Sequence, residues 1–88
     1  MAQFLGQIPE EVDALAIEFD NKANDIDTII STLTSKLGST TWTGPDRTRF
    51  EGDWNSTLTS GLRNVAGALR DAAILARGNA TQQRDASA

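Results

Sequence analysis

The strongest constraint on the fold of this chain is the break between two long amphipathic segments at residues 38–46. The break holds two glycines, a proline and a run of hydroxyl residues, and Trp42 is its one bulky apolar residue. Gly38 suits a left-handed position after a helix because it has no Cβ. Pro45 suits the first turn of a second helix, where its missing N–H costs nothing. The sequence therefore predicts helix, tight turn, helix, with Trp42 folded over the open end.

The first segment has apolar residues three and four apart, which indicates an amphipathic helix. This helix is expected over about residues 9–37, with Pro9 in its first turn and Glu10 and Glu11 near the positive end of the helix dipole. Its apolar stripe consists of Val12, Leu15, Phe19, Ile26, Ile29, Ile30, Leu33 and Leu37, with Ala16 and Ala23 completing one face.

The second segment repeats the helical spacing after a turn at residues 38–45. A second helix is expected over about residues 45–77. Its apolar positions are Phe50, Trp54, Leu58, Leu62, Val65, Leu69, Ala72, Leu75 and Ala76. The apolar pattern stops after Arg77, so residues 78–88 are interpreted as a flexible polar tail.

A chain of 88 residues allows a single domain, here spanning residues 1–88. Two helices enclose little interior, and without cysteine or histidine neither a disulfide nor a histidine-containing zinc site can help. The sequence thus predicts an all-α antiparallel hairpin that forms a four-helix bundle on dimerisation. The residues expected in the hairpin or dimer interface are Val12, Leu15, Phe19, Ile26, Ile30, Leu33, Phe50, Trp54, Leu58, Leu62, Val65 and Leu69.

Charged residues form one row on each expected helix. Asp13, Asp20 and Asp27 are seven apart, and so are the arginines from Arg63 to Arg84. For a symmetric hairpin, facing residue numbers add up to about 84, which places Arg63 near Asp20 and Arg70 near Asp13. The rows are interpreted either as solvated flanks or as edge charges that set register or partner choice.

The composition excludes several classes of function. Without histidine, cysteine or tyrosine the usual catalytic bases and nucleophiles are missing, so no enzymatic activity, cofactor or metal site is expected. The net charge of −4 argues against nucleic acid as a partner and makes membrane attachment unfavourable. Residues 1–8 have neither a basic region nor a sustained apolar core, so no cleaved signal peptide is expected. No run is long enough to span a bilayer.

The tripeptide Trp42, Thr43, Gly44, together with Phe50 and Trp54 downstream and a leucine-type seam on both sides, resembles the WXG (Esx) family of small helical-hairpin proteins exported by type VII secretion systems. The resemblance covers roughly residues 9–76. Many family members carry a Tyr-x-x-x-Asp/Glu export signal after the second helix. This chain has no tyrosine, and the corresponding positions are Ala76 and Ala80.

The resemblance implies a non-enzymatic secreted protein that folds in the cytoplasm and leaves without a cleaved signal peptide. Its partners would be a second hairpin, in a homodimer or a heterodimer, and the type VII secretion ATPase. Trp42 and Gly44 would form the secretion motif in the turn, and a partner chain would supply the missing tyrosine signal. Two alternative functions remain: a membrane-active effector, and a targeting partner of a larger secreted toxin.

Overall fold

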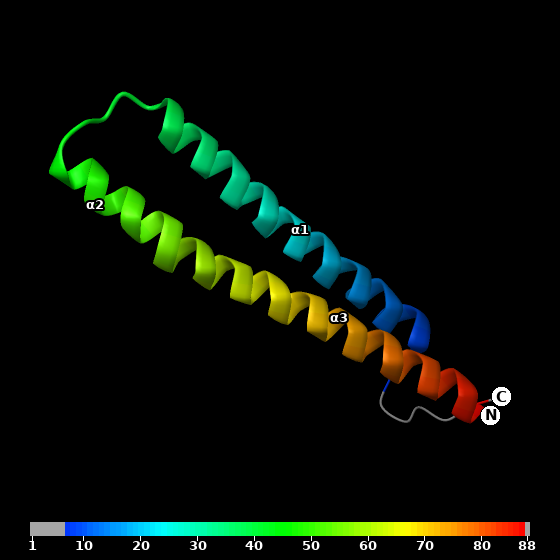
Figure 1. The fold of residues 1–88 in the computed structure, drawn as a ribbon. Coiled ribbons are helices and arrows are strands. Elements are labelled where there is room, and N and C mark those ends of the chain that lie inside the picture. Colours follow the sequence, from blue (N-terminus) through cyan, green and yellow to red (C-terminus); the bar gives the residue numbers. More distant parts are fainter. Residues whose placement is uncertain (1–6, 88) are drawn as a thin grey trace.

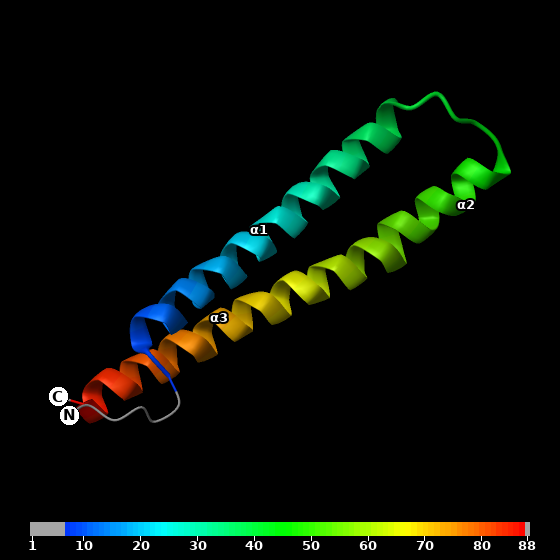
Figure 2. The same cartoon turned by 180° about the vertical axis from the view of Figure 1, so that it is seen from behind.

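A computed structural model of the chain, which describes residues 7–87, shows an antiparallel helical hairpin (Figure 1). Helix α1 (Pro9–Ser39) forms one arm, and α2 (Pro45–Asp53), η1 (Trp54–Leu58) and α3 (Thr59–Ser87) follow each other along the second arm (Figure 2). The molecule measures 68 × 18 × 13 Å and has a radius of gyration of 19.6 Å. A compact domain of this length has a radius of gyration of about 12 Å, so the hairpin is a rod. No helix within residues 7–87 is both long and apolar enough to span a membrane.

Helix α1 begins where Pro9 removes a backbone donor that no intrahelical carbonyl would bind. Its end differs from the prediction that Gly38 takes a left-handed conformation. The helix continues through Gly38 to Ser39, and Gly44 is the residue with positive φ among those described. The hydroxyls of Ser39 and Thr40 donate to the carbonyl of Lys36 at 3.1 and 2.6 Å. These bonds satisfy a carbonyl left free at the helix end, so no glycine is needed there.

The second arm is one continuous rod that contains a single wide π-helical turn, η1. The backbone N–H of Thr59 bonds to the carbonyl of Trp54, five residues back. In an ordinary α-helix, residues five apart point about 140° away from each other. The wide turn reduces this angle, and Trp54 and Thr59 are both buried against α1.

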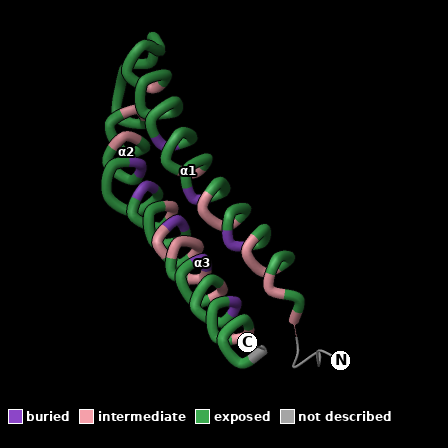
Figure 3. The backbone as a smooth tube through the Cα atoms, turned by 90° about the vertical axis from the view of Figure 1, so that its right-hand side faces the viewer, coloured by how far each residue is buried: buried purple, intermediate pink, exposed green. Residues whose placement is uncertain are grey.

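The core between the two arms consists mainly of alanines. Ala16, Ala23 and Ile30 on α1 are buried at a spacing of seven residues, and so are Thr59, Ala66, Ala73 and Ala80 on the second arm (Figure 3). No large side chain among the described residues is fully buried. Alanine lets the helix backbones approach closely but removes little apolar area from water. The hairpin core is therefore narrow, and most of the larger apolar side chains lie outside it.

Four ion pairs link the two arms, and three of them form a regular row on one side of this seam. Arg70 contacts Asp27 at 2.6 Å, Arg77 contacts Asp20 at 2.7 Å, and Arg84 contacts Asp13 at 2.6 Å. The predicted register, which placed Arg63 near Asp20 and Arg70 near Asp13, is wrong by two heptads. In each of these three pairs the residue numbers add up to 97, and the fourth pair is a longer contact of Arg84 with Glu10 at 3.6 Å. We call these three pairs the ion-pair ladder.

The ladder also corrects the expected flexible tail over residues 78–88. Helix α3 continues to Ser87, with Ala80 buried against α1. Arg84 lies in this last part, and the hydrogen bond to Asp13 raises the pKa of Arg84 above its usual value. The polar composition after Arg77 hid this extension, because a single alanine every seven residues is enough to continue so narrow a seam.

Candidate functional site

The tip of the hairpin is formed by the loop Thr40–Gly44, which we call the Trp42 loop. Gly44 ends the loop with φ of 115° and ψ of −178°. This backbone conformation is essentially restricted to glycine, because any Cβ strains it. Pro45 and Asp46 follow directly in the first turn of α2. The glycine of the Trp-x-Gly tripeptide is therefore needed to turn the chain into the second arm.

Arg47 fastens the Trp42 loop to α2. Its guanidinium donates to the backbone carbonyls of Trp42 at 3.0 Å and of Thr40 at 3.3 Å. The same group donates to the Glu51 carboxylate at 2.9 and 3.3 Å. Only 18% of the Arg47 side chain is exposed, the lowest value of any charged group in the ion pairs of the described chain. Glu51 thus orients Arg47, and Arg47 holds the extended loop backbone against the helix.

Three aromatic side chains line up behind the loop. The ring centroids of Trp42 and Phe50 are 5.8 Å apart, and those of Phe50 and Trp54 are 6.5 Å apart. Trp54 is buried, and its indole N–H donates to the hydroxyl of Thr34 on α1 at 2.8 Å. Together with Leu33, Lys36, Leu37 and Thr40, the rings border an open pocket of about 280 Å³. Trp42, 38% exposed, covers part of the tip rather than sealing it.

Substitution of Gly44 by alanine should destabilise the protein by about 1–3 kcal/mol, because alanine is strained in this backbone conformation. Substitution of Gly38 by alanine is the matched control, since Gly38 lies in helix α1 with no atom close to an added Cβ. Alanine there should stabilise the protein by up to about 1 kcal/mol. Urea unfolding followed by circular dichroism at one protein concentration measures both. Equal shifts for the two variants would contradict the assigned role of Gly44.

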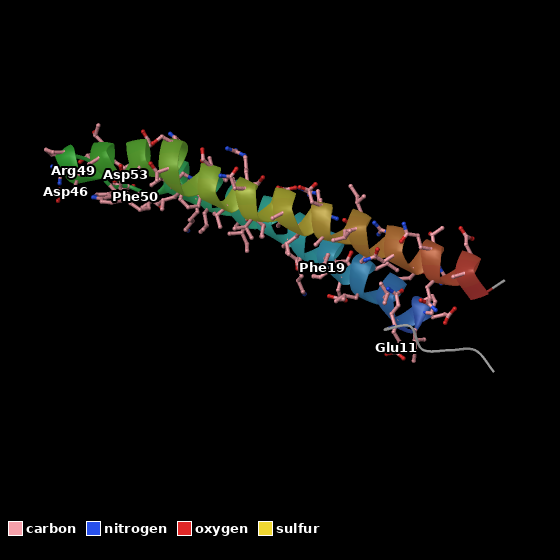
Figure 4. The ribbon with its side chains drawn as sticks, turned by 90° about the horizontal axis from the view of Figure 1, so that it is seen from below. Glu11, Phe19, Asp46, Arg49, Phe50 and Asp53 are labelled. Carbon is pink, nitrogen blue, oxygen red and sulfur yellow. The ribbon has the colours of Figure 1, made fainter. Side chains whose placement is uncertain are left out.

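Substitution of Arg47 by alanine should loosen the Trp42 loop while leaving the helices intact. The loop carbonyls lose a charged donor, so the Trp42 fluorescence anisotropy should fall in a Trp54→Phe background. Arg49→Ala is the control, because Arg49 is 76% exposed and contacts Asp46 only at 3.8 Å. Figure 4 shows Arg49 at the tip beside Asp46, Phe50 and Asp53. An unchanged anisotropy in Arg47→Ala would rule out the clamp.

A second feature is an uncovered apolar face that both arms share. Residues three and four positions before a seam residue lie on opposite flanks of a helix. On both arms the position three before the seam carries the ion-pair ladder, and the position four before it is apolar. The latter rows are Val12, Phe19, Ile26 and Leu33 on α1, and Leu62, Leu69 and Ala76 on α3. The ladder and the apolar rows therefore lie on opposite sides of the hairpin.

The apolar face widens by one further row on each arm, directly before the seam positions. On α1 this row contains Leu15 and Ile29, and on the second arm it contains Leu58, Val65 and Ala72. Leu15 is 49% exposed, Ile29 46% and Val65 51%. We call both sets of rows together the apolar face. Its uncovered aliphatic surface runs along the hairpin and is continuous with the pocket at Leu33.

The structure distributes the predicted interface residues over three environments. Ile30 and Trp54 are buried between the arms. The half-buried positions on the apolar face are Val12, Phe19, Ile26, Leu62 and Leu69. The exposed positions are Leu15, Leu33, Phe50, Leu58 and Val65. The two predicted motif residues, Trp42 and Gly44, both lie in the loop at the tip.

Arg47 and Thr34 belong to the tip, but the sequence analysis did not select them. An arginine two positions after a helix-starting proline, with glutamate four residues later, is a common helix pair. Its reach back to the loop carbonyls leaves no sequence signal. Thr34 had a signal: it occupies the position after Asp13, Asp20 and Asp27 in a row of residues seven apart.

Within residues 7–87 no cluster of side chains suits a metal ion. The fold defines the chain as a two-armed helical hairpin with an aromatic tip. Comparisons of the chain with protein-family models, curated proteins and solved structures find no match. The described residues present two exposed apolar features: the apolar face along the arms and the indole of Trp42 at the tip.

Proposed function

We propose that this chain is a non-enzymatic protein exported by a type VII secretion system as a dimer of helical hairpins. The observation that carries the proposal is that the chain has two separate exposed surfaces, the apolar face along the arms and the Trp42 loop at the tip. The narrow alanine core leaves a broad apolar face for a partner hairpin, while Arg47 binds the Trp42 loop at the tip. The resemblance of Trp42, Thr43 and Gly44 to the WXG motif suggests that a type VII secretion system binds this loop.

The surface area of the chain supports a dimer. The chain exposes 6148 Å², whereas a compact monomer of its mass exposes about 5,000 Å². The difference of about 1,100 Å² exceeds the ~800 Å² that each partner contributes to a standard interface. Burial of the apolar face against a second hairpin brings the exposed area into the range of a stable protein and completes a four-helix bundle.

The tip is suited to recognition by a second protein. An exposed tryptophan on an ordered loop loses little conformational freedom on binding, and tryptophan is frequent among the residues that dominate binding energy. Arg47 and Gly44 restrict the loop in advance. In the proposed mechanism the arms form the dimer, and the secretion ATPase binds the Trp42 loop, with a partner chain adding the tyrosine signal that this sequence lacks.

The proposal is tested by export from the source organism and from a strain without the secretion ATPase. The chain should appear in the medium of the first strain alone. Trp42→Ala should retain helicity and molar mass but remain in the cells, whereas Thr41→Ala, an exposed change in the same loop, should be exported. Export without the ATPase, or normal export of Trp42→Ala, would contradict the proposal.

A membrane-active effector is the second candidate, and the uncovered apolar face is the observation that favours it. Such an effector needs apolar surface that reaches the bilayer, usually beside basic residues. Release of a dye from anionic and neutral vesicles separates the two functions. A pure secretion substrate should release none, and an effector should release dye in proportion to protein concentration.

A further inference from the structure

We propose that the pocket at the tip of the hairpin binds a small carboxylate with an aliphatic body, about the size of octanoate. The pocket has a volume of about 280 Å³ and is bordered by Leu33, Lys36, Leu37, Thr40, Trp42, Phe50 and Trp54. The proposed function assigns the Trp42 loop to a second protein and gives this pocket no ligand. The site proposed here is therefore additional to it.

Three segments far apart in the sequence supply the walls of the pocket. Leu33 and Leu37 lie one turn apart on α1, and Phe50 and Trp54 lie one turn apart on the second arm. The Trp42 loop adds its indole, which is tilted by 38° from the Phe50 ring, while Phe50 and Trp54 are stacked at 17° (Figure 4). An apolar body in this space would contact aliphatic side chains on one arm and aromatic rings on the other.

The polar atoms at the walls are already bound within the chain. The indole N–H of Trp54 donates to Thr34 at 2.8 Å, and the hydroxyl of Thr40 donates to the carbonyl of Lys36 at 2.6 Å. The backbone carbonyls of Thr40 and Trp42 accept from Arg47. Water in the pocket therefore finds few hydrogen-bond partners, and an apolar ligand displaces it at little cost.

The charge of the ligand follows from Lys36. Among the described residues that border the pocket, Lys36 is the only charged one. No ion pair within residues 7–87 includes it, whereas Lys22 has Glu18 and Asp25 within 4 Å. The stem of Lys36 borders apolar surface while its ammonium stays in water. A ligand that complements both has an apolar body with one negative group at its end.

The volume of the pocket limits the size of this ligand. A cavity of about 280 Å³ holds about nine groups of about 30 Å³, the volume of one water molecule in the liquid. A chain of about eight carbons fills this space and leaves the carboxylate at the mouth, beside Lys36. Cavities for small ligands start at about 300 Å³, so a lipid with two acyl chains is too large. A leucine side chain of a second protein is smaller than the pocket and carries no charge for Lys36.

Fluorescence reads this binding directly, because both tryptophans of the chain border the pocket. Octanoate with a bromine at the end of its chain quenches an indole on contact. Its addition to the full chain should quench the emission saturably, and unlabelled octanoate should reverse the quenching. Trp42→Phe and Trp54→Phe each leave one tryptophan, and both variants should be quenched. Titration calorimetry should give one octanoate per chain.

The charge of Lys36 is tested by changing the side chain and the ligand separately. Lys36→Met keeps an apolar stem and should weaken octanoate binding about fivefold, the upper range for an exposed ion pair. Octanol, which has no charge, should bind both proteins equally, and Lys36→Arg should restore octanoate binding. Lys22→Met is the matched control, since Lys22 lies two heptads earlier on the same helix. Equal octanoate affinity of Lys36→Met and the unchanged protein would overturn the assigned carboxylate.

A second pair of variants separates the pocket from the apolar face. Phe50→Ala removes a wall and should weaken octanoate and octanol alike, whereas Leu15→Ala, on the apolar face away from the tip, should change neither. Light scattering should give the same molar mass with and without octanoate. Equal weakening by both variants would place the ligand on the apolar face and overturn the site. Absence of saturable quenching would overturn the small ligand and favour a side chain of a second protein. Neither result bears on export, which Trp42→Ala tests separately.

Discussion

Substitution of Trp54 by alanine should destabilise the protein by about 4 kcal/mol, the largest effect expected from a single change. Trp54 is the largest side chain buried between the arms and is 7% exposed. Its removal leaves a cavity at the tip end of a core that otherwise consists mainly of alanines. Its indole also makes the hydrogen bond to Thr34, which contributes about 1 kcal/mol. Urea unfolding at fixed protein concentration measures the change.

The matched control is Phe50→Ala, because Phe50 stacks on Trp54 but is 40% exposed. Its removal should destabilise the protein much less, since a half-exposed side chain buries less apolar area on folding. Thr34→Val tests the hydrogen bond separately, because it leaves the indole N–H without its acceptor and keeps the shape of the side chain. If Trp54→Ala and Phe50→Ala shift the midpoint equally, Trp54 does not anchor α1 to the second arm.

The hairpin itself was predictable from the sequence, because its two apolar stripes are long and the break between them is sharp. Pro9 and Pro45 mark the starts of α1 and α2 where first-turn prolines are expected. The glycine with a positive φ was predicted wrongly. Two glycines flank the turn, and hydroxyls of Ser39 and Thr40 satisfy the end of α1, so the positive φ falls on Gly44 instead of Gly38.

The register could not be read from a symmetric turn. The loop Thr40–Gly44 leads from the end of α1 to the tip and lies beside the first turns of the second arm, where Arg47 binds its carbonyls. The second arm therefore reaches beyond the end of α1, and the facing residues shift by about two heptads. The rows of aspartates on α1 and arginines on α3 correctly indicated which flanks of the two helices meet. Which arginine pairs with which aspartate depended on the shape of the loop.

The core was predicted only in part, because Ala16 and Ala23 were expected to complete the apolar face of the first helix but larger apolar residues were expected to form most of the interface. In the structure the alanines at positions 16, 23, 66, 73 and 80 lie at the closest approach of the arms. The leucines and isoleucines beside them spread into a second surface. The π-helical turn is a related case. The seam of Thr59, Ala66 and Ala73, extended back by seven, would reach Gly52, but the buried residue before Thr59 is Trp54, which lies one wide turn before it.

The alanine seam leads to the second large prediction, the substitution of Ala23 by leucine. Ala23 is fully buried, and in the register of the ladder it lies beside Ala73, which is also fully buried. A leucine there cannot fit between backbones at this distance, so the arms must separate locally. Overpacking of this kind costs about 1–3 kcal/mol, and more when the backbone has to move.

Separation at Ala23 should also break the nearest rungs of the ladder, Arg77 with Asp20 and Arg70 with Asp27, because both depend on the same spacing of the arms. Ala14→Leu is the control, since Ala14 is exposed on the outer surface of α1 and leucine has almost the same helix propensity as alanine. Urea unfolding gives the stability of both variants. Repeating it at several salt concentrations gives the contribution of the ion-pair ladder to the free energy of unfolding. Ala23→Leu should lose much of the wild-type dependence of stability on salt, and Ala14→Leu should keep it. Equal stability of the two variants would mean that the arms are held apart by the larger side chains and that the alanines are not the contact.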